Sequence, residues 1–201
     1  MNEFSDEQLF QLFQRGDEKA FNQLVNKYKD RIYNFLYRIV NDVDLAEDLA
    51  QDTFVKVFIH KDSYKELYKF STWMYTIAKN LAFTELRKNK RRKTSSFSDI
   101  SKDDWKLQFE DSSLGDIDKE NNDRENRKNI QNALNEISID FRTIIILRDI
   151  QELSYEDISK IVEVPVGTVK SRINRGRDKL YQLLKRKVVW FEWMSMILIS
   201  I

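Results

Sequence analysis

Apolar residues recur every three or four positions along most of the chain, which is the repeat of an α-helix with one buried face. The clearest stretch runs from Asp17 to about Val40. Its apolar positions include Phe21, Leu24, Val25, Tyr28, Ile32, Phe35, Leu36 and Ile39. Asp17 is a suitable N-cap for this helix, and Ser5 with Gln8 three residues later is the capping-box pattern of a shorter helix before it. The pattern therefore predicts a succession of amphipathic helices.

Further helices follow the same logic. Asp44 with Glu47 indicates a third helix that runs to about Ile59. Ser71 indicates the start of a fourth, which ends in a basic run. After a long polar stretch, apolar periodicity returns near Arg127 and predicts two more helices. Their apolar positions include Ile130, Leu134, Ile137, Phe141, Ile144, Ile145 and Leu147.

Composition supports a fold without strands. The chain of 201 residues has 4 glycines and 1 proline, too few for the turns of an all-β protein. It has no cysteine, which excludes disulfides and thiolate metal sites and fits a reducing cytosol. The single histidine, His60, has no second imidazole with which to bind a metal, and we interpret it as a surface residue at a helix end. We predict an all-α protein without a metal or other cofactor.

Charge is segregated along the chain although its net value is only +1. Six of the seven residues of Arg87–Lys93 are basic. Asp99–Glu125 holds ten acidic and four basic residues, a local net charge of −6, and Gly167–Lys187 holds eight basic and one acidic, a local net charge of +7. Two basic surfaces separated by an acidic stretch indicate two nucleic-acid contacts joined by a linker.

These patterns divide the chain into four parts. Residues 1–93 form a first helical domain, and residues 127–187 form a second. Residues 94–126 lack sustained periodicity, and we predict an acidic linker that is extended or only partly ordered. Residues 188–201 form a hydrophobic tail with eleven apolar residues in fourteen.

A helix-turn-helix occupies the second domain. Ser154 and Asp157 are spaced as a capping box for a helix from Tyr155 to about Val162. Pro165 then suits the entry to a second helix that begins near Val166 and continues past Leu184.

The second helix of this motif separates an apolar face from a polar one. Its apolar residues are Val169, Ile173, Leu180 and Leu184, with Gly176 on the same stripe. The opposite face carries side chains that suit phosphates and base edges in the major groove. We expect Ser171, Asn174 and Arg175 to contact bases, Lys170 and Arg172 to contact the DNA backbone, and Thr168 to flank them.

Three segments together resemble one known family. PVGTVKSRINRGRDKL at 165–180 resembles the last recognition helix of extracytoplasmic-function (ECF) sigma factors, which are small members of the sigma-70 family. LAEDLAQDTFVKVF at 45–58 resembles the segment that grips the clamp helices of core RNA polymerase, and KFSTWMYTIAKNL at 69–81 resembles the segment that melts and reads the −10 promoter element. The similarity extends from about residue 5 to 187 and implies a transcription-initiation factor.

The resemblance implies roles for residues of the first domain. Asp48, Gln51 and Asp52 would form an acidic and amide patch toward basic residues of the polymerase. The −10 contacts would be Trp73, Lys79, Asn80, Arg87, Arg91 and Arg92. Aromatic rings can stack on unpaired bases and cations can bind phosphates, although Trp73 could equally belong to the core. In ECF factors the loop corresponding to residues 60–68 captures a flipped promoter base.

The resemblance also implies partners and location. Core RNA polymerase and promoter DNA would bind, the linker would thread toward the polymerase active centre, and an anti-sigma factor, often membrane-bound, would hold the protein inactive. The expected location is the cytoplasm, and the expected context is a stress or envelope response. We find no metal cluster, glycine-rich phosphate loop or nucleophile constellation, so we expect neither an enzyme nor a small-molecule substrate.

The hydrophobic tail departs from the family pattern, because ECF factors usually end soon after the last helix. A membrane-spanning helix needs about 20 apolar residues, so this tail cannot cross a bilayer unaided. It could anchor at a membrane surface, pack on the second domain or contact a partner, and we favour the last two.

A stand-alone helix-turn-helix regulator is the alternative to an initiation factor. It would explain the second domain but neither LAEDLAQDTF nor KFSTWMYTIAKNL.

Overall fold

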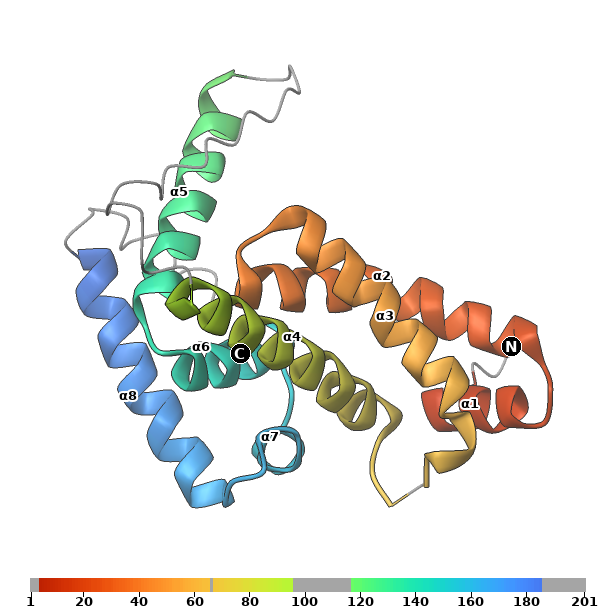
Figure 1. The fold of residues 1–201 in the computed structure, drawn as a ribbon. Helices are drawn as coiled ribbons and strands as arrows, with labels where there is room; N and C mark the ends of the chain where they lie inside the picture. Colours follow the sequence, from red (N-terminus) through yellow and green to blue (C-terminus); the bar gives the residue numbers. More distant parts are fainter. Residues whose placement is uncertain (1–3, 66, 96–116, 186–201) are drawn as a thin grey trace.

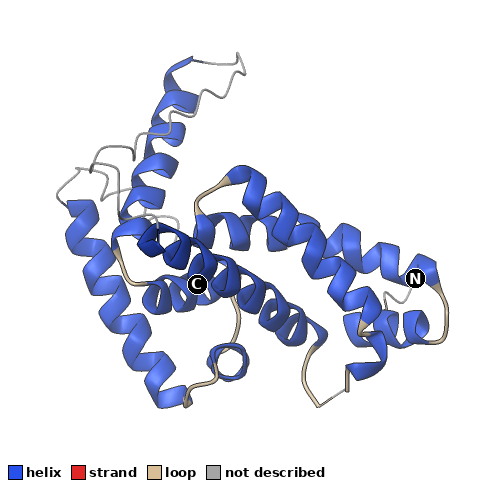
Figure 2. Cartoon of the chain, in the orientation of Figure 1, coloured by secondary structure: helices blue, strands red, loops and turns tan. Residues whose placement is uncertain are grey.

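The computed structural model describes residues 4–65, 67–95 and 117–185, and all regular structure in these ranges is helical (Figure 2). The linker core and the hydrophobic tail, both singled out in the sequence, lie outside the described residues. No helix in the described part of the chain combines the length and apolar character that a membrane crossing requires.

The amino-terminal domain contains four α-helices and a short 3-10 helix. They are α1 (Asp6–Gln14), α2 (Glu18–Val40), α3 (Val43–Ile59), η1 (Lys61–Ser63) and α4 (Phe70–Ser95). The predicted Ser5–Gln8 capping box is present, and Asp17 caps α2 through the backbone N–H groups of Lys19 and Ala20. Local side-chain to backbone bonds thus begin both helices where the sequence indicated.

The predicted start of α3 is wrong by two residues. Asp42, not Asp44, is the N-cap, because its carboxylate accepts from the backbone N–H of Leu45. The preceding Asn41 has φ 55° and ends α2 in the left-handed conformation, which brings Asp42 into position to cap. Residues of the same type two positions apart offered two possible caps, and the geometry of the turn selects the first.

Five helical elements follow in the carboxy-terminal domain. They are α5 (Ile117–Glu136), α6 (Ile139–Ile145), the π-helical turn η2 (Ile146–Ile150), α7 (Tyr155–Val162) and α8 (Val166–Lys185). The helix-turn-helix predicted at α7 and α8 is confirmed. α5 differs from expectation, because it begins inside the segment predicted to be a linker.

The two domains pack against each other rather than standing apart. α4 crosses the centre of the molecule, with α2 and α3 on one side and α6 and α7 on the other (Figure 1). One continuous hydrophobic core contains buried residues of α1 to α4 together with Ile158 and Ile161 of α7 and Val169 and Ile173 of α8. A second, smaller core lies among α5, α6 and α8.

Candidate nucleic-acid and polymerase interfaces

The outer face of α8 is the surface predicted to contact duplex DNA. Lys170, Ser171, Asn174 and Arg175 are exposed. Thr168 and Arg172 lie at the edges of this face and are half-buried. The opposite face is buried through Val169, Ile173, Gly176, Leu180 and Leu184. The α8 surface predicted to contact DNA is thus free to enter a major groove, whereas its contacts with bases stay a prediction.

Close packing and an ion pair set the orientation of α8. A Cβ atom placed on Gly176 would lie 2.7 Å from Ile145 Cδ1, so α8 approaches α6 at a distance that only glycine allows without displacement. The next residue, Arg177, donates through Nε to Oδ2 of the largely buried Asp149 at 3.0 Å and pairs with the other carboxylate oxygen. The hydrogen bond that Arg177 donates to Asp149 raises the pKa of Arg177. These contacts were not anticipated from the sequence, because they join α8 to residues about thirty positions away.

Tyr155 of α7 supports one of the predicted phosphate-binding residues. Its ring lies 5.5 Å from Lys170 Nζ and 4.7 Å from the guanidinium carbon of Arg148. A ring between two cations favours their charge through its quadrupole and restrains their side chains. Tyr155 therefore holds Lys170 at the edge of the exposed face of α8.

The predicted polymerase contact on α3 is exposed and continues as an apolar stripe. Asp48, Gln51 and Asp52 face solvent, while Leu49 is buried and Leu45 is half-buried against the core. One and two turns further along, Val55 is 53% exposed and Ile59 is 64% exposed. The sequence analysis missed these two apolar residues, although their spacing of three and four from Asp52 and Val55 was a detectable signal. Acidic and apolar groups together form a surface suited to a basic, amphipathic partner.

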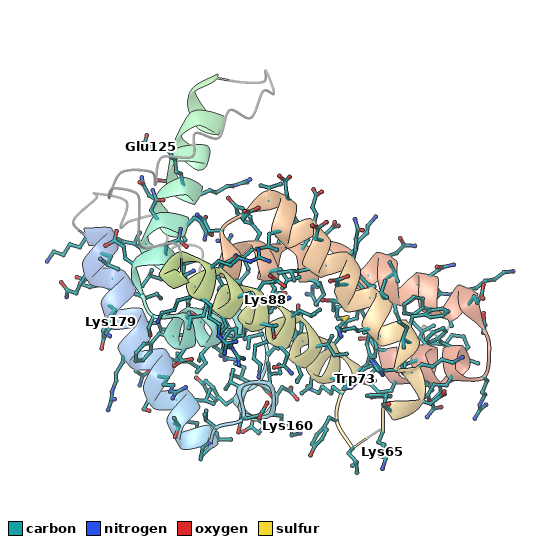
Figure 3. All side chains as sticks on the ribbon, viewed as in Figure 1. Lys65, Trp73, Lys88, Glu125, Lys160 and Lys179 are labelled. Carbon is teal, nitrogen blue, oxygen red and sulfur yellow. The ribbon has the colours of Figure 1, made fainter. Side chains whose placement is uncertain are left out.

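On α4, three of the predicted −10 contacts share one stripe. Trp73, Asn80 and Arg87 follow one another at intervals of seven residues, about two helical turns. Asn80 and Arg87 are exposed, as are Arg91 and Arg92 near the end of the helix. Trp73 is half-buried, edge-on to Phe10 with ring centroids 5.5 Å apart. It is thus both a core contact and a partly open ring at the loop end of α4 (Figure 3).

Lys79 does not face solvent with the other predicted −10 residues. It is 7% exposed, and its ammonium donates to the backbone carbonyl of Ile161 in α7 at 2.7 Å. The expectation that Lys79 is available to DNA is incorrect for this arrangement, because the second domain covers it. Tyr75, the other aromatic residue of this segment, is also buried, and its hydroxyl donates to Gln151 Oε1 at 2.5 Å. Burial raises the pKa of the Tyr75 hydroxyl.

The loop before α4 has one buried tyrosine and two exposed residues with apolar side-chain surface. Tyr64 is buried, and its hydroxyl donates to the backbone carbonyl of Tyr68 at 2.7 Å. Leu67 and Tyr68 are 72% and 50% exposed. Lys160 of α7 lies 4.6 Å from the Tyr68 ring. His60, at the C-cap of α3, is exposed as predicted.

The amino end of α7 binds the amino end of α4 through one carboxylate. Asp157 accepts from Lys69 Nζ at 2.9 Å, from Thr72 Oγ1 at 3.1 Å and from Ser154 Oγ at 2.6 Å. Burial alone would raise the pKa of Asp157, but these hydrogen bonds outweigh it and hold the pKa below its ordinary value. The hydrogen bond that Lys69 donates to Asp157 raises the pKa of Lys69. Ser154 accepts from the Asp157 backbone N–H as the capping box predicts, and the Asp157 side chain also acts across the domain boundary.

Comparison with known proteins agrees with this geometry. The family model described as Sigma-70 region 2 matches residues 24–92, and that described as Sigma-70, region 4 matches residues 127–180. The fold and its exposed helices therefore define a two-domain factor of the sigma-70 type.

Individual relatives define the group more narrowly. The chain is 35% identical over 182 residues to the ECF RNA polymerase sigma factor SigW of Bacillus subtilis. The matched region covers 85% of this chain and 92% of that protein. It is 34% identical to the RNA polymerase sigma-H factor of Pseudomonas aeruginosa, over 90% of this chain and 94% of that one. The crystal structure of the sigma factor RpoE with the anti-sigma factor NepR from Bartonella quintana is 30% identical, with a TM-score of 0.68, and covers 83% of this chain and 98% of that chain. The chain belongs to the ECF RNA polymerase sigma factors, which act as initiation factors rather than enzymes.

Proposed function

We propose that the chain binds core RNA polymerase through α3, opens and reads the −10 element with α4, and reads the −35 element as duplex DNA with α8. The single observation that carries this division of labour is the exposure of three separate polar surfaces on three helices of one sigma-type fold. The polymerase performs the chemistry of transcription, and this chain selects the promoter.

The α3 surface suits a protein partner better than DNA. Asp48 and Asp52 would repel phosphates, whereas exposed Val55 and Ile59 offer apolar area next to them. Cationic side chains on the polymerase would pair with the carboxylates, and apolar side chains would cover the stripe.

The two DNA-binding surfaces differ in the state of DNA that they fit. α8 has the single polar face of a major-groove helix, so it suits duplex DNA. α4 has a half-buried aromatic ring followed by Asn80, Arg87, Arg91 and Arg92, an arrangement that suits stacked, unpaired bases on a backbone held by cations. About six to eight phosphate contacts in all would give binding by the free chain a log–log salt slope near −5 to −7.

Regulation is proposed by analogy with the relatives. The Bartonella protein is described in complex with an anti-sigma factor, so we expect an anti-sigma factor, often membrane-bound in this family, to hold this chain inactive in the cytoplasm. A stress or envelope signal would release it.

Run-off transcription tests the proposal. Purified bacterial core polymerase, genomic fragments and the full chain should yield discrete transcripts that are absent without the chain, and the chain should co-elute with the core enzyme. The double variant Asp48→Lys and Asp52→Lys should abolish co-elution. Glu18→Lys, an equally exposed acidic position on α2, is the matched control and should leave co-elution unchanged.

Two results would contradict parts of this proposal. A chain that binds duplex DNA but neither starts a transcript nor co-elutes with the core enzyme would act as a stand-alone helix-turn-helix protein. If the α3 variant and its control affect co-elution equally, then α3 does not form the polymerase contact.

A further inference from the structure

Two tyrosines of α2 form a stacked pair at the surface where α2 meets α3. Tyr33 and Tyr37 lie about one helical turn apart, with ring centroids 6.2 Å apart and an interplanar angle of 14°. Both rings pack against the hydrophobic core, and both residues are only half-buried. This part of α2 therefore offers two nearly parallel aromatic rings to a partner.

The neighbouring surface of α3 carries carboxylates. α2 and α3 lie side by side and are joined by the turn at residues 41–42 (Figure 1). Asp44, Glu47 and Asp48 are exposed at the beginning of α3. Because they are spaced by three and four residues from Asp44, they share one side of the helix. The beginning of α3 is thus strongly acidic.

Glu47 connects the carboxylates to the tyrosine pair. Burial raises the pKa of the Tyr33 hydroxyl, and the charges of Glu47 and Tyr37 raise it further. The interaction between two charges falls with their separation, so the Glu47 carboxylate lies near the Tyr33 ring. The two tyrosines and the three carboxylates therefore form one continuous surface, which we call the α2–α3 surface.

This surface lacks a cation among the residues that the structure describes. In that part of the chain lysines lie over the rings of Phe13, Tyr68 and Phe141, whereas no positive group lies over Tyr33 or Tyr37. The ion pairs between described residues also use carboxylates other than the three of the α2–α3 surface. The described chain thus leaves both the rings and the carboxylates available to a cation from outside.

An arginine side chain fits both parts of the α2–α3 surface. A guanidinium is planar and stacks on aromatic rings, and its N–H groups can form two parallel hydrogen bonds with one carboxylate. An ammonium can pair with the carboxylate but has no plane to stack on the rings. DNA does not suit this surface, because the carboxylates would repel its phosphates. The chemistry therefore indicates an arginine that belongs to a protein.

We propose that the α2–α3 surface binds an arginine of core RNA polymerase, which stacks on Tyr33 and Tyr37 and pairs with Glu47. This inference rests on the proposed binding of core polymerase through α3. The α2–α3 surface is continuous with that contact, because Asp48 belongs to both and Gln51 lies one turn beyond Glu47. An arginine held between the two helices would fix the direction in which α3 lies on the polymerase. Arginine and tyrosine are also enriched among the residues that dominate binding energy in protein interfaces.

The affinity of the full chain for core polymerase tests the role of the rings. The chain, labelled at its amino terminus, is titrated with purified core enzyme and followed by fluorescence anisotropy. Tyr33→Leu with Tyr37→Leu removes the rings, and we expect binding to weaken about five- to tenfold. Tyr33→Phe with Tyr37→Phe keeps the rings and should bind within about twofold of the natural chain.

Glu47→Gln tests the carboxylate without altering the hydrophobic core. Its side chain is exposed, so the variant should fold as the natural chain does, and it tests the inference even if the leucine variant unfolds. We expect affinity for core polymerase to fall about three- to tenfold, because the guanidinium loses a charged acceptor. Glu18→Gln, at an exposed position near the other end of α2, is the matched control and should leave the affinity unchanged.

A small-molecule probe tests the preference for arginine. N-acetyl-arginine methylamide is titrated into the natural full chain, and NMR follows the ring resonances of Tyr33 and Tyr37. N-acetyl-lysine methylamide is the comparison. We expect the arginine probe to shift these resonances several-fold more than the lysine probe does, and Glu47→Gln should reduce the shift.

The possible failures are distinct. If the leucine variant folds and binds core polymerase as tightly as the natural chain, or if Glu47→Gln and Glu18→Gln bind equally, the inference is overturned while the proposed function stands. Equal shifts by the two probes would overturn recognition of a guanidinium. If the arginine probe shifts the resonances while none of the substitutions changes polymerase binding, the surface serves another protein and the assignment to polymerase is overturned. If the natural chain neither co-elutes with core polymerase nor starts transcripts, the proposed function fails and the inference fails with it.

Discussion

α8 and α4 are both long helices with basic outer ends, but they relate to the rest of the molecule in opposite ways. α8 buries one face and leaves the other exposed to solvent, including the side chains of Ser171, Asn174 and Arg175. α4 lies in the middle of the molecule with neighbours on several sides, and its polar residues divide between exposed positions and contacts with α7 (Figure 1). A helix at the surface can present a whole face to a partner, whereas a central helix can do so only after its neighbours move.

The largest expected effect comes from breaking the contact that holds the two helical domains together. Arg142→Met keeps the side-chain volume but removes donors to carbonyls at the ends of α2 and α5. Burial lowers the pKa of Arg142 to about 10. We expect the free energy of unfolding to fall by about 3 kcal/mol in urea denaturation, because several buried acceptors lose their partners. Arg175→Ala, an exposed arginine, should change it by less than about 0.5 kcal/mol.

The buried face of α8 should be the next most sensitive position. Gly176→Leu would force a side chain against Ile145 and Phe141, and we expect about 2 kcal/mol of destabilisation by overpacking. Thermal unfolding measures this effect, and Gly167→Leu is the control because a Cβ there meets nothing within 4 Å. Equal losses from the two variants would contradict the close approach of α8 to α6.

Substitutions on the exposed face of α8 should weaken DNA binding without lowering the stability of the fold. Arg175→Ala should weaken binding of the polymerase complex to duplex promoter DNA by about 1 to 2 kcal/mol while leaving folding intact, because the side chain is exposed and proposed to reach a base edge. Quantitative footprinting at fixed salt measures the loss. Asp178→Ala, exposed on the next turn, is the comparison, and an equal loss there would remove Arg175 from base recognition.

On α4, removal of the buried Tyr75 hydroxyl measures how much its hydrogen bond contributes to stability. Tyr75→Phe removes the hydrogen bond to Gln151 and keeps the ring against Phe35, so we expect a loss of about 1 kcal/mol. Tyr33→Phe, at a half-buried ring on α2, should cost less. Denaturation curves that coincide for Tyr75→Phe and the natural chain would mean that the bond does not persist in solution.

The smallest effect is the pH dependence of the α4–α7 contact. Asp157 has a lowered pKa, so its contribution to stability is complete above the ordinary aspartate pKa and is lost as the pH falls below that value through its own lowered pKa. Lys69 has a raised pKa, so its contribution is present at neutral pH and lost only in strong alkali. The carboxylates of Glu7 and Glu156 also favour the charged form of Lys69. When the pH is lowered from about 7 to about 3, the free energy of unfolding of the natural chain should fall more than that of Asp157→Asn. We expect the difference between the two chains to be under about 1 kcal/mol in urea denaturation.

The difference between the two helices also explains what could be predicted from the sequence. Local signals sufficed where one helix is governed by its own residues: Asp17 for α2, Ser154 for α7, and the amphipathic pattern of α8. They failed for Lys79 and Tyr75, whose partners Ile161 and Gln151 lie more than 75 positions away. The polar pattern around α5 resembled a linker because few apolar residues mark its first turns. The side on which a central helix is covered depends on tertiary contacts that periodicity does not encode.

Asp157 belongs structurally to both domains. Its backbone N–H is capped by Ser154 within the helix-turn-helix, while its carboxylate binds Lys69 and Thr72 of the other domain. A chimera that joined this amino-terminal domain to the carboxy-terminal domain of a distant relative would keep both DNA-reading surfaces but lose the matched groups between them. An engineer who exchanges one domain therefore has to match the residues that meet Lys69 and Thr72 as well as the residues that read DNA.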